Sequence, residues 1–214
     1  TVFATEVEVP EHLQKEFRVI KLIDGYRTRG HLFTKTNPVR ERRKYLPTLD
    51  IENFGLEASD LDTIFNAGDI MEIGPSSLRD IIQHLQRIYC ESIGLEYMYI
   101  RDPEKVQWIQ QRLNINDNHP NFSNDEKKHI LEKLTEAVAF ENFLHTKYVG
   151  QKRFSLEGGE SLIPALDAVV EAAANQGVEE FVMGMAHRGR LNALTNIFGK
   201  STKAIFSEFD GKDY

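Results

Sequence analysis

The sequence predicts an α/β protein, with a mainly helical region over residues 1–150 and the start of a parallel-sheet domain over residues 151–214. Three observations support this prediction. Apolar residues recur at helical spacing through most of the first 150 residues. Residues 179–185 ("EEFVMGM") form a nearly continuous apolar run, which is typical of a strand buried on both faces. This run lies between two helical patterns, as it would in a parallel α/β fold.

In the helical region, the first helix is expected to end near Gly25, and a short helix is expected over residues 58–66. A stronger helix follows within residues 75–94, where Ser77 and Asp80 resemble a capping box. Its predicted buried face consists of Ile81, Ile82, Leu85, Ile88 and Tyr89.

The remaining helices are predicted from their starting residues. Asp102 followed by Pro103 begins one helix, because proline suits the first turn. Ser123 with Glu126 opens a long helix. That helix is expected to bury the apolar side chains of Ile130, Leu134, Val138 and Phe143. A further helix is expected within residues 161–177, with Pro164 in its first turn and Gly177 after its end. Two more are expected after the apolar run, within residues 190–199 and 201–209.

The composition excludes several classes of protein. A formal net charge of -7 over 214 residues does not provide the broad basic surface that binds nucleic acid. The single cysteine, Cys90, excludes a disulfide framework and fits a reducing compartment. No apolar run approaches the ~20 residues of a membrane span, and the start lacks the apolar core of a signal peptide. We therefore expect neither nucleic acid nor membrane as a partner. One strong strand cannot form a sheet alone, so we expect the chain to be a fragment of a longer protein.

The junction between the apolar run and the following helix carries His187, Arg188, Gly189 and Arg190. In open α/β folds, ligands bind at the carboxyl ends of strands, near helix N-termini. Arginines form charge-assisted bonds with phosphate or carboxylate, and an imidazole can donate, accept or carry charge near neutrality. These residues indicate a site for an anionic substrate or a diphosphate cofactor. In the alternative interpretation, the histidine is merely packed and the arginines pair with Glu157 or Glu160.

Other polar clusters are weaker candidates. Residues 151–161 could form a second anion-binding turn, although a plain loop leading into a helix is favoured. A solvated helix end is favoured for the cluster Arg27, Arg29 and His31, and a structural or exposed position is favoured for His145. No HExxH motif, nucleophile elbow or Cys-His dyad is present in the sequence.

Five motifs together resemble the E1 component of 2-oxoglutarate dehydrogenase. They occur in the order "GYRTRGHLF", "FGLEASDLDTIF", "YCESIGLEYMYIRDPEKVQWIQ", "KRFSLEGGESLIPALDAVV" and "MGMAHRGRLNAL". The resemblance covers nearly the whole chain. It implies that residues 151–214 begin a thiamin diphosphate-binding α/β domain and that residues 1–150 precede it.

The resemblance implies that family members decarboxylate 2-oxoglutarate with thiamin diphosphate and Mg²⁺ and transfer the succinyl group to a lipoyl group of the succinyltransferase component (E2). By its place in the HRGR motif, His187 matches the catalytic histidine that contacts substrate or the reaction intermediate. Arg188 matches the arginine that helps to hold the cofactor. The Mg²⁺ ligands, a second active-site histidine and the second cofactor domain are expected outside this chain. The chain alone is therefore expected to be inactive.

The resemblance also implies a homodimer, and association with E2 and with dihydrolipoyl dehydrogenase (E3), in bacterial cytoplasm or the mitochondrial matrix. Two alternatives remain open at this point. One is a related decarboxylase that acts on 2-oxoadipate or does without a lipoyl acceptor. The other is a helical interaction or regulatory module that binds anions through its arginine clusters.

Overall fold

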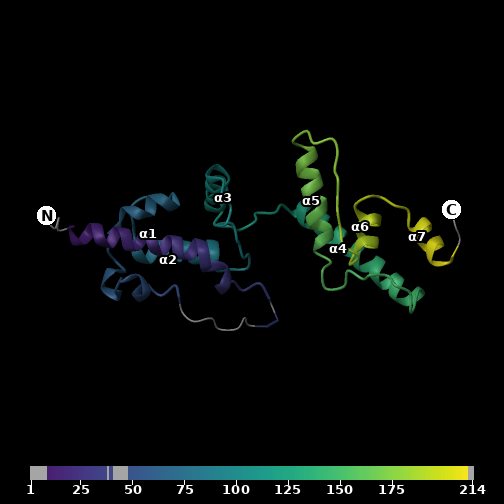
Figure 1. Cartoon of the computed structure of the whole chain (residues 1–214), viewed down its shortest axis with the longest axis horizontal. Coiled ribbons are helices and arrows are strands. Elements are labelled where there is room, and N and C mark those ends of the chain that lie inside the picture. The colour runs from purple at the N-terminus through teal and green to yellow at the C-terminus, as the bar shows by residue number, and fades with distance from the viewer. Residues whose placement is uncertain (1–8, 38, 41–47, 212–214) are drawn as a thin grey trace, which may run out of the picture. The chain divides into compact units, whose positions relative to one another are not determined.

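The computed structural model describes residues 9–37, 39–40 and 48–211 of the chain. The chain divides into two compact units, Thr1–Asn121 and Phe122–Tyr214, and helices dominate both (Figure 1). The division between residues 121 and 122 places the long helix with the residues that follow it. The domain boundary at residue 150, which was based on sequence character, stays a prediction. Among the helices described, none combines the length and the apolar character that crossing a bilayer requires.

The first unit is built from three α-helices, four short 3-10 helices and one small hairpin-like strand pair within the described residues. The elements in chain order are α1 (Glu11–Arg29), η1 (Gly30–Phe33), η2 (Ile51–Phe54), η3 (Ala58–Asp60), β1 (Ile64–Phe65), η4 (Asn66–Met71), β2 (Ser76–Ser77), α2 (Leu78–Tyr89) and α3 (Pro103–Ile115). Strands β1 and β2 are antiparallel, with Ile64 opposite Ser77 and Phe65 opposite Ser76.

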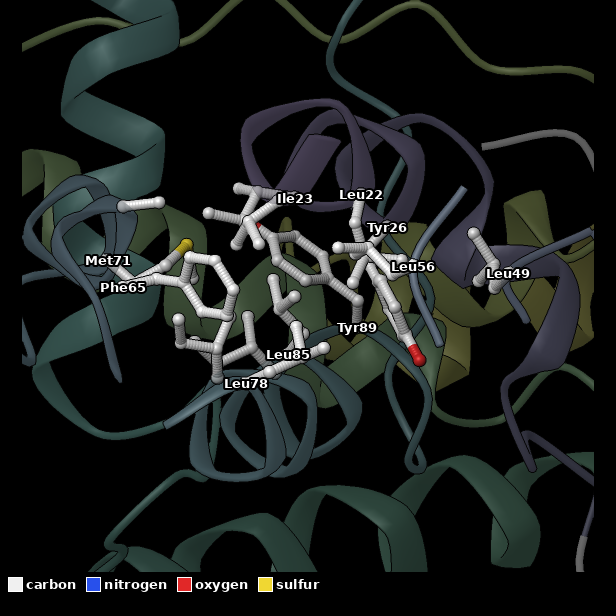
Figure 2. Packing of buried hydrophobic residues seen from close by; sticks show 14 of the residues in the cluster. Leu22, Ile23, Tyr26, Leu49, Leu56, Phe65, Met71, Leu78, Leu85 and Tyr89 are labelled. Carbon is white, nitrogen blue, oxygen red and sulfur yellow. The ribbon is translucent and has the colours of Figure 1, made fainter. Parts of the chain in front are cut away.

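The core of the first unit lies between α1 and α2. Helix α1 contributes Leu22, Ile23 and Tyr26, and α2 contributes Leu78 and Leu85 (Figure 2). The predicted buried face of α2 is confirmed, with four of its five side chains buried and the fifth, Ile82, partly buried against the same core. The apolar period of this helix was strong enough to identify its packed face.

Two predictions in the first unit were wrong. Helix α1 does not end near Gly25 but continues to Arg29. Gly25 is buried there, and a Cβ atom at this position would lie 2.7 Å from Cζ of Phe54. The glycine therefore serves close packing rather than helix termination. The expected helix over residues 58–66 is only the 3-10 turn η3 followed by β1.

The second unit contains α4 (Asn124–Lys147), α5 (Leu162–Ala174), α6 (Arg190–Asn196) and α7 (Thr202–Phe209). The predicted start of α4 at Ser123 is confirmed, and the structure shows a capping box there. The Ser123 hydroxyl accepts a hydrogen bond from the Glu126 amide at 3.2 Å, and the Glu126 carboxylate accepts one from the Ser123 amide at 2.7 Å. Pro164 lies in the first turn of α5, and Gly177 follows the end of this helix, as predicted.

The predicted buried face of α4 was only partly right. Ile130 and Leu134 are partly buried, but Val138 and Phe143 are exposed. The buried residues are instead Ala137, Phe140 and Leu144, together with the acidic Glu141. The buried face contacts α5 and α6, and its partner on α6 includes a polar side chain. An apolar pattern does not identify a face whose packing includes polar groups.

The predicted buried strand at residues 179–185 was also wrong for this chain. Residues 178–186 have neither helical nor strand structure, and Phe181, Val182 and Met185 are exposed. A strand needs a neighbour for its backbone hydrogen bonds, and the described residues offer none. The mainly helical prediction is thus confirmed, while the parallel sheet is not formed by the part of the chain described.

Candidate functional site

Residues 187–190, here called the HRGR turn, connect the extended segment to α6. His187, Arg188 and Arg190 are exposed, and Gly189 is buried. Gly189 is the N-cap of α6 and has a φ of 75°. Its carbonyl accepts a hydrogen bond from the Ala193 amide at 3.0 Å. This left-handed conformation favours glycine. The turn thus presents one imidazole and two guanidinium groups on a backbone fixed by a buried glycine.

The arginines of the turn are not neutralised by the acids that the sequence suggested. Nη2 of Arg188 donates to the backbone carbonyl of Glu157 at 3.3 Å, not to a carboxylate. The Glu157 carboxylate instead lies 3.5 Å from Arg153, and the Glu160 carboxylate accepts the Gly158 amide at 2.9 Å. Over the described ranges, no ion pair joins Arg188 or Arg190 to an acid. Both guanidinium charges are therefore available to an anion.

Phe154 lies against the turn from the preceding loop. The centroid of its ring is 5.1 Å from that of the His187 ring, and the two ring planes are tilted by 55°. The Arg190 guanidinium lies 5.2 Å from the centroid of the Phe154 ring. The Phe154 carbonyl accepts the Gly189 amide at 2.7 Å. Ring contact, a cation–π contact and a backbone hydrogen bond thus join one residue to three residues of the turn.

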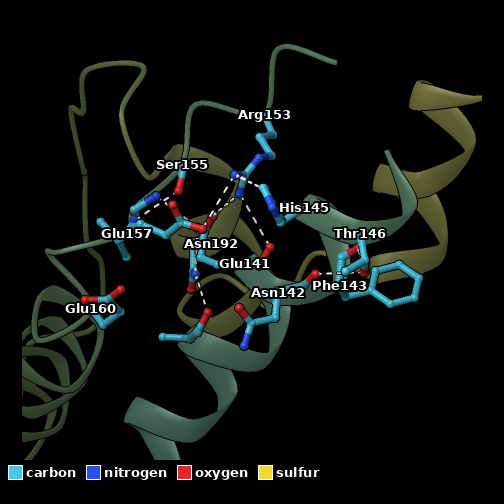
Figure 3. Close-up of polar contacts among 12 residues, drawn as sticks. Glu141, Asn142, Phe143, His145, Thr146, Arg153, Ser155, Glu157, Glu160 and Asn192 are labelled. Atoms are coloured by element: carbon cyan, nitrogen blue, oxygen red, sulfur yellow. Dashed lines mark hydrogen bonds and ion pairs between the residues drawn. The ribbon is translucent and has the colours of Figure 1, made fainter. Parts of the chain in front are cut away.

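The loop that carries Phe154 is attached to α4 and α6 by the buried carboxylate of Glu141 (Figure 3). Its Oε1 accepts the Leu156 amide at 3.0 Å and Nδ2 of Asn192 at 3.1 Å. Its Oε2 lies 3.3 Å from Nη1 of Arg153. Asn192 is fully buried and also donates to the Ala137 carbonyl at 3.0 Å. The charge of Glu141 is therefore paired and hydrogen-bonded, as a buried charge requires.

Two other predicted clusters turn out to be structural. Arg153 contacts Glu141, Glu157 and, at 2.9 Å, Nδ1 of His145. Its contacts therefore support the interpretation of residues 151–161 as a loop leading into α5. The solvated interpretation of the cluster around Arg27 was wrong, because Arg27 is buried in the first unit and contacts the Ile70 carbonyl at 3.4 Å.

Three residues of this site were not predicted from the sequence, namely Phe154, Glu141 and Asn192. A signal for Glu141 was present, because it lies between Phe140 and Leu144 at a position that helical spacing places on their side of α4. An acid on a buried face needs a partner. Nothing in the sequence indicates that this partner includes the amide of Leu156, 15 residues away.

The first unit holds a cavity of about 540 Å³, lined by Tyr26, Phe33, Lys35, Leu49, Asp50, Gln83, Gln86, Arg87, Cys90 and Glu91. Burial raises the pKa of the Cys90 thiol to about 11, so this cysteine is a poor nucleophile at neutral pH. The residues described contain no group of three or more His, Cys, Asp and Glu side chains suited to a metal ion.

The chain is similar in sequence to curated proteins that are named for 2-oxoglutarate metabolism or 2-oxoglutarate dehydrogenase. It is 46% identical over 209 residues to the multifunctional 2-oxoglutarate metabolism enzyme of Mycolicibacterium vanbaalenii, covering 96% of this chain and 17% of that protein. It is 46% identical over 201 residues to the 2-oxoglutarate dehydrogenase E1 component of Cupriavidus necator, covering 93% of this chain and 21% of that protein. The corresponding protein of Azotobacter vinelandii is 44% identical over 212 residues, covering 98% and 22%. No family model matches the chain.

The chain belongs to the family of 2-oxoglutarate dehydrogenase E1 components. It spans about a fifth of the length of the curated relatives that it matches. The predicted resemblance is thereby confirmed. The alternative of a separate regulatory module is not favoured by these relatives.

Proposed function

We propose that this chain is the part of a thiamin diphosphate-dependent 2-oxoglutarate dehydrogenase E1 that carries one side of its active site. The observation that supports this most strongly is the HRGR turn itself. It presents an exposed imidazole beside two guanidinium groups that no carboxylate of the described residues neutralises. The substrate has two carboxylates and the cofactor has a diphosphate, so each would provide the missing negative charge.

Arg188 fits the cofactor role. Its bond to the Glu157 carbonyl uses one of the five N–H donors of a guanidinium group, and the other donors remain for a diphosphate. Thiamin diphosphate, when bound, supplies the carbanion that attacks the 2-oxo carbon. The Mg²⁺ that accompanies it would take ligands from residues outside this chain.

His187 fits the catalytic role. Its ring rests on Phe154 while the side chain remains exposed, so that the imidazole nitrogens can meet a ligand. We propose that this imidazole hydrogen-bonds the bound 2-oxo acid and supplies or accepts a proton during the reaction. The neighbouring Arg190 guanidinium adds positive charge near a substrate carboxylate.

The relatives' names support a place in a multienzyme complex. Two of the relatives above are named as E1 components, and a Corynebacterium glutamicum relative is named as an E1/E2 component. We propose that the protein containing this chain passes the succinyl group to E2, works with E3 and forms a homodimer. Among the two compartments expected, the bacterial relatives favour the bacterial cytoplasm.

The test uses the full-length protein that contains this chain, because the cofactor site needs residues outside it. His187→Ala should lower kcat for 2-oxoglutarate decarboxylation by roughly 10²- to 10⁴-fold, the usual contribution of a positioned proton donor or acceptor. The affinity of the His187→Ala variant for thiamin diphosphate should change little. Arg188→Met should instead weaken cofactor binding, measured by fluorescence titration.

The matched controls are His12→Ala and Arg101→Met, which change exposed residues of the first unit. Both should retain normal kinetics and cofactor affinity. Normal kinetics in His187→Ala would contradict the catalytic assignment. A decarboxylation rate from residues 1–214 alone, well above that of free cofactor, would contradict the expectation that this segment is inactive.

A further inference from the structure

The HRGR turn is held mainly through one neighbouring loop. Phe154 contacts the ring of His187, the guanidinium of Arg190 and the amide of Gly189. The backbone of Phe154 has a φ of 49°, a conformation that non-glycine residues adopt rarely. Such a conformation persists only where the surrounding contacts fix it. The loop is therefore held in one arrangement, and the turn packs against it.

The contacts that fix this loop converge on Glu141. Its two carboxylate oxygens bind Arg153 and the Leu156 amide, which flank Phe154 on either side, and also Asn192 on α6 (Figure 3). One buried side chain thus joins α4, the loop and the helix that follows the turn. A displacement of the Glu141 carboxylate would move the loop relative to α6.

The fit between loop and turn leaves little free space. A Cβ atom built on Gly189 would lie 2.5 Å from Cδ1 of Leu156 and 3.3 Å from its Cβ. The side chain of Leu156 keeps the loop from approaching the turn more closely. The hydrogen bond from the Gly189 amide to the Phe154 carbonyl holds the loop against the turn. The directions of the His187 and Arg190 side chains thus depend on where the Phe154 loop sits.

We propose that Phe154 is a positioning residue, which orients His187 and Arg190 for the anionic substrate, and that buried Glu141 holds Phe154 in place. The inference rests on the proposed function and adds to it two residues that do not touch the reacting atoms. Phe154 acts through ring contact and its carbonyl. Glu141 acts through the Arg153 guanidinium on one side of Phe154 and through the Leu156 backbone amide on the other.

The experiment uses the full-length protein. Phe154→Leu removes the ring but keeps an apolar side chain, and it should lower kcat for 2-oxoglutarate roughly ten- to hundredfold, because small misplacements of a catalytic group cost this much. Phe154→Tyr keeps the ring and should retain kcat to within about twofold, since the ring contacts with His187 and Arg190 are kept. Glu141→Gln should also lower kcat. The uncharged glutamine amide would face the Arg153 guanidinium and could not replace its ion pair. Should Phe154→Leu fail to fold, Phe154→Met replaces it.

The matched control is Phe143→Leu in the same unit. Phe143 also loses ring contacts, to Tyr148 at 6.4 Å and Phe206 at 4.8 Å, but it does not contact the HRGR turn. This variant should lower the Tm about as much as Phe154→Leu while keeping a normal kcat. An unchanged kcat in Phe154→Leu, or an equal loss of kcat in Phe143→Leu, would overturn the proposal.

A second readout does not depend on activity. Hydrogen exchange at residues 186–194, followed by mass spectrometry in the intact protein, should become faster in Phe154→Leu and Glu141→Gln and stay normal in Phe143→Leu. If His187→Ala keeps full activity, the proposed function fails, and exchange alone then decides whether Phe154 holds the turn. Unchanged exchange in both variants would then overturn the positioning role.

Discussion

Gly189→Ala is the substitution whose effect follows most directly from the geometry of the HRGR turn. Two costs add at this position. Alanine must adopt a φ of 75°, which is unfavourable for a residue with a Cβ atom. The new Cβ would also lie 2.5 Å from Cδ1 of Leu156, a buried side chain that has little room to move.

The magnitude can be worked from these two costs. The left-handed backbone costs a non-glycine residue about 1–2 kcal/mol. Forcing a methyl group into a packed site costs about 1–3 kcal/mol. The free energy of unfolding of the second unit should therefore fall by about 2–5 kcal/mol, before the smaller gain of about 0.4–1 kcal/mol from a stiffer unfolded chain.

Gly177→Ala separates the two costs. Gly177 has a φ of 87°, but a Cβ at this position has no atom within 4 Å. It should carry the backbone cost alone, so that the two variants differ by about 1–3 kcal/mol, the cost of overpacking. Hydrogen exchange at increasing urea concentration measures this difference in peptides from α4. Peptides from α2 in the first unit provide an internal reference that neither substitution should change.

Equal destabilisation by Gly189→Ala and Gly177→Ala would refute the reasoning. It would mean that the HRGR turn does not pack against Leu156 in solution. The contacts of Phe154 with the turn would then lose their structural basis as well, since Phe154 and Leu156 belong to the same short loop.

Two further predictions concern the pH dependence of the first unit. The Lys15 ammonium, 2.8 Å from Oδ1 of Asp60, holds the pKa of this buried carboxyl below its ordinary value of 3.8. Its stabilisation is therefore complete above about pH 4 and is lost as the pH falls further. Asp60→Asn should flatten the pH dependence of the unfolding midpoint below about pH 4. Burial lowers the pKa of His84 below its ordinary 6.5, against the attraction of Asp117 at 3.2 Å. The unfolded chain then takes up a proton first, so stability should fall as pH drops below about 6.5, and His84→Gln should remove this slope between about pH 7.5 and 5.5. A slope that persists in either variant would assign it to other groups.

Features set by neighbouring residues could be predicted from the sequence. The Asp102 carboxylate accepts the amides of Glu104 and Lys105, and the Ser77 hydroxyl accepts the amide of Asp80. Each cap involves residues at most three positions apart. The side chain and the amide are therefore close in the chain before any tertiary contact forms, and the residue types alone indicate the helix start.

Features set by distant residues could not be predicted in this way. The prediction of a helix end near Gly25 was wrong, since nothing nearby in the sequence shows that Phe54 packs over this glycine. The strand prediction at residues 179–185 failed for a related reason, because a strand depends on a neighbour that the pattern does not supply. The helix that starts at Arg190 was predicted from the sequence, and the role of the HRGR turn as a site stays a prediction. The support of this turn by Glu141 and Phe154 was not found, because it joins residues up to 51 positions apart.

The extended segment before the HRGR turn has a consequence for handling the protein. Val182 is 97% exposed, with Phe181 and Met185 exposed nearby, on residues that form no strand in the described structure. An apolar, extended stretch of this kind can pair with the same stretch of a second molecule and start aggregation. Glu179 and Glu180 adjoin it, and their like charges repel an identical stretch. We expect these two negative charges to oppose such pairing between copies of the chain.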